Sequence, residues 1–173
     1  MGAGKSRVGR ALAWLLGWGF VDLDRRVEAR EGRAIAQIFR ESGEAAFRRA
    51  ETAALQELLG ELKESPGNVV ALGGGAPAQA ENRKRLEARG AVTVFLDVPL
   101  KTLWERCRAS RGKRPLVKDE ESFRRLYDCR RRHYAGAVIQ VKAAERSPKE
   151  LAAEIAQKLG FTLRSGRKTQ ERQ

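Results

Sequence analysis

The stretch from Met1 to Ser6 constrains this chain more than any other part of it. It matches the end of the phosphate-binding loop pattern G-x-x-x-x-G-K-[ST] through Gly2, Gly4, Lys5 and Ser6. In such loops glycines let backbone N–H groups close around phosphates, the lysine reaches the outer phosphates, and the hydroxyl can bind Mg²⁺. The alternative reading is a flexible start rich in small residues, and the pattern that follows argues against it.

A helix is predicted from Lys5 to Leu16. Apolar residues recur there at helical spacing, namely Val8, Ala11, Leu12 and Leu15, and Gly17 can end the helix. The loop therefore leads into a helix N-terminus, which favours an anion. In the complete pattern the first glycine would fall two residues before Met1, after a buried strand. Neither is in this chain, so we expect the sheet to lack the strand that carries the loop.

Residues 19–24 are predicted to form a short buried strand that ends in acids. Residues two apart on a strand face the same side, so Asp22 and Asp24 are expected to point together toward one site. Two carboxylates beside a phosphate loop suit Mg²⁺ binding and proton acceptance. The alternative is that Asp24 only caps the helix that follows.

Two helices are predicted next, the first over 34–39 and ending near Gly43, the second over about 44–62. Arg48 and Glu51 lie three apart on the second helix, so they can pair at the surface or line one groove.

A predicted strand over 68–72 runs directly into Gly73-Gly74-Gly75. Such a glycine run indicates close approach of a ligand to the backbone more than it indicates a flexible turn, and we expect it to have no packing purpose. Ligands of parallel α/β sheets bind at this end of the strands.

The rest of the chain continues the alternation. Further strands are predicted over 92–98 and 138–142, and further helices over 81–88, 101–108, 119–133 and from Ser147, where Pro148 and Glu150 complete a capping box. Alternating strands and helices predict a three-layer α/β domain with a central parallel sheet flanked by helices and without its first strand.

Charge and composition limit the partners. The net charge of +13 favours anionic ligands, but the few aromatic residues do not interleave with the arginines, which argues against nucleic acid as a partner. A basic segment, about 108–118, is broken by Gly112 and Pro115 and can close over a phosphate site. No run of about 18 apolar residues and no secretory pattern occur, and Cys107 and Cys129 are expected to be free thiols in the cytoplasm.

In order and at workable spacing, these motifs resemble those of the shikimate kinase family. The resemblance runs from Met1 to about Leu159. It rests on Met1–Ser6 with Val8-Gly9, Phe20–Asp24, Ile38-Phe39 through Gly43-Glu44, Phe47–Glu51, Leu72–Ala76, Arg114-Pro115-Leu116, and Arg130 four residues before Tyr134. This chain departs from the family in its missing strand and first glycine, and in Arg7, where the family commonly has threonine.

The resemblance implies phosphorylation of the 3-hydroxyl of shikimate by ATP, a step of aromatic amino-acid biosynthesis. It implies one domain over 1–160, with substrate-binding helices over about 24–62, the lid over about 108–118, and a basic disordered tail over 161–173. It assigns ATP binding to Gly2, Ala3, Gly4, Lys5, Ser6, Arg7, Arg114 and Arg146, and Mg²⁺ to Ser6 and Asp22. It assigns shikimate binding to Asp24, Arg48, Gly73, Gly74, Gly75 and Arg130, and catalysis to Lys5, Asp24 and Arg114.

Other readings stay open. Another small-molecule kinase of the same fold, such as a gluconate kinase, would share the loop. An inactive truncated homologue, or a basic protein that binds nucleic acid, would share the charge. We expect a monomer.

Overall fold

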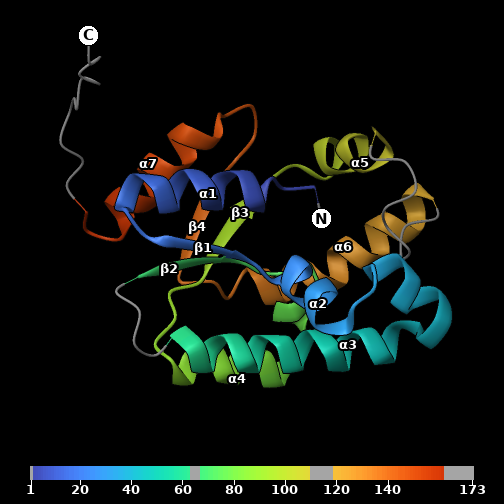
Figure 1. The fold of residues 1–173 in the computed structure, drawn as a ribbon. Coiled ribbons are helices and arrows are strands. Elements are labelled where there is room, and N and C mark those ends of the chain that lie inside the picture. Colours follow the sequence, from blue (N-terminus) through green and yellow to red (C-terminus); the bar gives the residue numbers. More distant parts are fainter. Residues whose placement is uncertain (1, 63–66, 110–118, 162–173) are drawn as a thin grey trace, which may run out of the picture.

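The computed structural model describes residues 2–62, 67–109 and 119–161. Arg114, most of the predicted lid and nearly all of the predicted tail lie outside these ranges. The elements, shown in Figure 1, are α1 (Lys5–Leu16), β1 (Gly19–Asp22), α2 (Leu23–Glu31), α3 (Ile35–Glu61), β2 (Asn68–Ala71), the short 3₁₀ helix η2 (Ala76–Ala78), α4 (Ala80–Ala88), β3 (Val94–Asp97), α5 (Leu100–Ala109), α6 (Glu120–Tyr134), β4 (Ile139–Lys142) and α7 (Pro148–Lys158).

The helix ends follow local sequence signals. α1 begins directly after Gly4 and ends at Gly17, and both glycines have left-handed backbone conformations. α7 has the predicted capping box, in which Ser147 accepts from the Glu150 N–H and Glu150 accepts from the Ser147 N–H.

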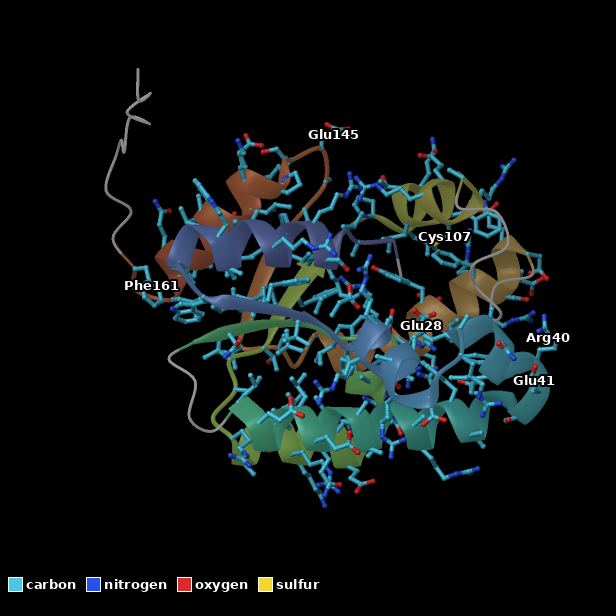
Figure 2. All side chains as sticks on the ribbon, in the orientation of Figure 1. Glu28, Arg40, Glu41, Cys107, Glu145 and Phe161 are labelled. Atoms are coloured by element: carbon cyan, nitrogen blue, oxygen red, sulfur yellow. The ribbon has the colours of Figure 1, made fainter. Side chains whose placement is uncertain are left out.

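α3 joins the two helices that were predicted separately. Gly43, at φ 78° and ψ 175°, interrupts the helical backbone at the predicted boundary. The start of α3 is held by Glu28 of α2, labelled in Figure 2, whose Oε1 accepts from the Ile35 N–H at 3.0 Å.

The described strands form two parallel pairs, β1 with β2 and β3 with β4, and no hydrogen bond of the sheet joins the pairs. The expected parallel α/β fold is confirmed, while the sheet divides into halves. α1 shares a core with both halves, because Val8 and Leu12 belong to the same buried cluster as Leu96 of β3 and Ile139 of β4, and Val69 of β2 packs against this cluster. A strand leading into the loop before α1 would run beneath this helix, between the halves.

Helices cover both faces of the strands (Figure 1). Val69 faces a core built from α1, α5, α6 and α7, whereas its neighbour Val70 faces a second core built from α2, α3 and α4. Successive strand residues point to opposite faces, so these two cores are the outer interfaces of a three-layer domain. Every helix in the described ranges is too short or too polar to span a lipid bilayer.

Candidate active site

The phosphate loop has the backbone that its glycines predict. Gly2 and Gly4 have φ angles of 68° and 84°, a region that L residues rarely adopt. Gly2 also packs tightly, since a Cβ there would lie 3.3 Å from the Leu103 oxygen and 3.4 Å from Sγ of Cys107, labelled on α5 in Figure 2. No side chain caps α1, so the first turn of this helix presents its backbone N–H groups at the end of the loop.

Asp22 and Asp24 do not share a strand face, and that prediction was wrong. β1 ends at Asp22, and Asp24 already lies in the first turn of α2. The predicted capping role belongs to Asp22 instead, whose Oδ1 accepts from the Asp24 N–H at 3.1 Å. The two carboxylates still meet one site, because the turn from strand to helix folds them toward the loop. Asp22 Oδ2 accepts from the Ser6 hydroxyl at 2.6 Å.

The pKa of Asp24 depends on burial and on the charged residues around it. Its side chain is exposed, yet the surrounding protein withdraws enough water to raise its pKa. Lys5 of the loop opposes this rise, while the charges of Asp22 and Glu28 add to it. A carboxyl group with a raised pKa beside a phosphate loop is suited to accepting a proton.

The glycine triplet makes room for charged side chains, which corrects the expectation that it has no packing purpose. A Cβ on Gly73 would lie 2.4 Å from Glu51 Oε1 and 2.7 Å from Asp24 Oδ1. A Cβ on Gly75 would lie 2.0 Å from Arg48 Nη1. Any larger residue at either position would displace these groups.

Arg48 and Glu51 form an inward pair on α3, so the reading of a surface pair was wrong. Arg48 Nη1 donates to Glu51 Oε2 at 2.7 Å, and its Nη2 donates to Glu44 at 2.9 Å on the exposed side. The Arg48 side chain is 17 % exposed and that of Glu51 is 1 % exposed. Burial is the main cause of the raised pKa of Glu51, and Arg48 opposes it.

Arg130 reaches the same place from α6. It is buried, with 6 % exposure, and its positive charge acts to lower the pKa of Glu51. Tyr134, one turn later, donates its hydroxyl to the carbonyl oxygen of Gly74, which fixes the middle of the glycine triplet. α3, α6 and the loop after β2 therefore bring together Arg48, Arg130, Glu51 and the glycines.

A hollow of about 90 Å³ adjoins the phosphate loop, and its lining includes Gly4, Arg7, Arg106, Arg146 and Pro148. Arg146 is held there by Glu154 and by the Lys142 carbonyl at 3.3 Å. Three arginines around a small hollow next to a phosphate loop suit the remainder of a nucleotide.

Sequence reasoning missed three residues of this site. Arg106 donates to the Gly2 carbonyl at 3.4 Å, and the sequence showed it only as one of several arginines near the end of the helix predicted over 101–108. Glu51 was left undecided between two readings. Tyr134 was noted only as a spacing marker for Arg130.

The chain matches known proteins over most of its length. The sequence profile described as shikimate kinase matches residues 1–160. Among curated relatives, shikimate kinase of Persephonella marina is 39 % identical over 155 residues, covering 90 % of this chain and 92 % of the relative. That of Thermus thermophilus is 42 % identical over 162 residues, covering 92 % of this chain and 85 % of the relative.

Solved structures agree. Shikimate kinase from Acinetobacter baumannii in complex with shikimate superimposes with a TM-score of 0.84 at 36 % identity, covering 92 % of this chain and 88 % of that one. The Aquifex aeolicus enzyme gives a TM-score of 0.80 at 38 % identity, covering 92 % of both chains. With its loop, glycine triplet and inward arginines in place, this chain belongs to the shikimate kinase family.

Proposed function

We propose that this chain transfers the γ-phosphate of ATP to the 3-hydroxyl of shikimate. The observation that carries the proposal is the position of Asp24. On one side of its carboxyl group, the positive charge of Lys5 in the phosphate loop lowers its pKa. On the other side, its Oδ1 lies close to Gly73, next to the hydrogen-bonded pair of Arg48 and Glu51. A proton acceptor between a phosphate loop and an arginine-lined site fits phosphoryl transfer to a hydroxyl of a carboxylated substrate.

The loop binds the phosphates of ATP. Backbone N–H groups at the start of α1 and the ammonium group of Lys5 hold the phosphates, and Arg7, Arg106 and Arg146 surround the nucleotide in the adjoining hollow. Arg114, outside the described residues, is proposed to add charge from the lid. Phosphoryl transfer depends mainly on such positioning and charge stabilisation.

The Ser6 hydroxyl and the Asp22 carboxylate fit Mg²⁺. They are hard oxygen donors 2.6 Å apart at the end of the loop, as this ion prefers. In the part of the chain that the structure describes, no three Asp, Glu, His or Cys side chains are grouped so that they could hold a metal ion. Mg²⁺ is usually bound through one or two carboxylates and the substrate's phosphates and keeps several waters, so the phosphates of ATP and water would complete its ligands. When bound, Mg²⁺ would neutralise charge on the phosphates.

The arginines of α3 and α6 bind the shikimate carboxylate. A guanidinium group can make two parallel hydrogen bonds to a carboxylate, and both Arg48 and Arg130 are withdrawn from bulk water. Gly73, Gly74 and Gly75 let the ring approach the backbone, and Asp24 accepts the proton of the 3-hydroxyl as the new P–O bond forms. We place the whole function in one monomeric cytoplasmic domain over 1–160.

A coupled assay of ADP release tests the proposal. ATP turnover should require shikimate and should not occur with gluconate or nucleoside monophosphates. Lys5→Ala and Asp24→Asn should each lower kcat by about 100-fold or more. The matched changes Lys84→Ala and Asp128→Asn, at exposed helix positions, should leave kcat unchanged. Turnover without shikimate, or turnover indifferent to both site changes, would contradict the proposal.

A further inference from the structure

Glu51 is a buried carboxyl group that the proposed reaction does not use. The residue is 0 % exposed. Its Oε2 accepts from Arg48 Nη1 at 2.7 Å and from Gln79 Nε2 at 3.1 Å. Its Oε1 is buried and has no hydrogen-bond donor among the described residues. A buried carboxylate oxygen without a donor calls for an explanation, because such groups are nearly always satisfied.

The unpartnered oxygen faces the substrate site. Glu51 Oε1 and Asp24 Oδ1 lie 2.4 Å and 2.7 Å from the same point, the position of a Cβ on Gly73, so they are at most 5.1 Å apart. Two carboxylates this close, one of them fully buried, favour a state in which one carries a proton.

The charges around Glu51 are balanced when the site is empty. The groups that face it are Arg48 on its own helix, Asp24 from α2, Arg130 and Tyr134 from α6, and the neutral Gln79 before α4. Two arginines thus oppose two carboxylates. Glu44 contacts Arg48 only from the exposed side.

A bound carboxylated substrate adds one negative charge to this balanced, poorly solvated site. One proton taken from solvent would restore the balance. Asp24 is the less suitable acceptor of that proton, since Lys5 favours its charged form and the reaction requires it as a base. Glu51 has a free oxygen on which a proton can reside, and burial raises its pKa even in the empty site.

We propose that Glu51, which holds Arg48 as a carboxylate in the empty site, takes up one proton from solvent when the anionic substrate engages Arg48. The inference rests on the proposed function, because it assumes a substrate carboxylate at Arg48. It makes substrate affinity depend on pH in a defined direction.

The proposed proton uptake fixes how the affinity for shikimate changes with pH. Because the pKa of Glu51 is higher in the complex than in the free enzyme, this affinity is constant below the pKa of Glu51 in the free enzyme and falls as pH rises above it. The fall approaches tenfold per pH unit, the limit for one linked proton, and ends once pH exceeds the pKa in the complex.

Calorimetric titration of shikimate into the full chain measures the proton directly. The observed heat is compared in buffers of low and high ionisation enthalpy between pH 5.5 and 8.5. The native chain should take up a fraction of a proton that approaches one within the window, and its KM for shikimate should rise with pH. Glu51→Gln should abolish the uptake and flatten the KM profile, with kcat affected less than KM.

Two further variants locate the proton. Glu44→Gln removes the exposed partner of Arg48 and should leave uptake unchanged. Asp24→Asn removes one negative charge beside Glu51, so it should shift the proton uptake to lower pH without abolishing it, which supports Glu51 even if Glu51→Gln fails to fold. Binding without proton uptake, or uptake that persists in Glu51→Gln and disappears in Asp24→Asn, would overturn this inference and leave the proposed function intact. No binding of shikimate at any pH would overturn both.

Discussion

At the scale of single residues, the site is shaped by the absence of side chains as much as by their presence. Gly73 and Gly75 are buried, and the space that a Cβ would fill is occupied by the carboxylates of Glu51 and Asp24 and the guanidinium of Arg48. These three groups come from two helices and converge on one short loop. Their positions therefore depend on the loop remaining free of side chains.

Replacing Gly73 by alanine tests this dependence. The new methyl group would lie within 3 Å of both carboxylates, so Glu51 and Asp24 must move. We expect kcat/KM for shikimate to fall at least tenfold and stability to fall by about 1–3 kcal/mol, as in other overpacked sites. Steady-state kinetics and urea denaturation measure the two effects.

Gly60→Ala is the matched control. Gly60 lies near the end of α3, and a Cβ there meets nothing within 4 Å. Alanine should raise helix stability by up to about 1 kcal/mol and leave kinetics unchanged. If both alanine variants behave alike, the crowding at Gly73 has no functional consequence.

At the scale of elements, helix ends are specified locally and strand ends are not. Ser147, Pro148 and Glu150 predict the start of α7, and the structure has the complete capping box there. The end of β1 was misplaced by two residues, because Leu23 continues the apolar pattern of the strand while its backbone already belongs to α2.

Removing the cap of α7 gives a prediction for this element. Ser147→Ala leaves the Glu150 N–H of the first turn without its acceptor and should destabilise the protein by about 1 kcal/mol. Ser147→Asp keeps an acceptor and should cost little. Chemical denaturation compares the two, with ATP kinetics near the native value in each. Equal losses of stability would show that the cap is dispensable.

At the scale of the whole molecule, the division of the strands into two pairs is the dominant feature. Val69, Val70 and Phe95 are only partly buried, although they lie on strands with helices on both faces. α1 bridges the halves through its apolar face, and the sheet itself does not. In the described ranges no strand is hydrogen-bonded to both pairs, so a parallel strand could be added at the edges of the pairs.

An N-terminal extension tests whether a strand fits between the two strand pairs. Ten residues of alternating Val and Ile, followed by a glycine and one further residue before Met1, complete the loop pattern and should add that strand. We expect a stability gain of several kcal/mol from buried apolar area and tighter binding of ATP, because the loop would be anchored at both ends. A Gly/Ser extension of equal length is the control. Identical melting temperatures and ATP affinities for the two extensions would show that no strand enters the sheet.

The sequence by itself determined the elements and the chemistry that they carry. Apolar periodicity located the four described strands, and the helices other than α2 and η2, near their observed places, and the loop and the glycine triplet were identified from residue type and order. Arg48 and Arg130 were assigned to the substrate through the resemblance to the family. These signals are local, since helix and strand periods, caps and glycine-rich turns depend on residues a few positions apart.

Only the tertiary structure decided which groups meet. That Glu51 is buried against Gly73, that Arg106 reaches the loop from α5, and that the strands divide into two pairs are contacts between distant segments. One-dimensional patterns show which face of an element is apolar, but not which neighbour covers it. A charged residue one turn from core positions gives the same sequence pattern whether its side chain faces water or a substrate site. Packing alone distinguishes the two, because it decides where water is excluded.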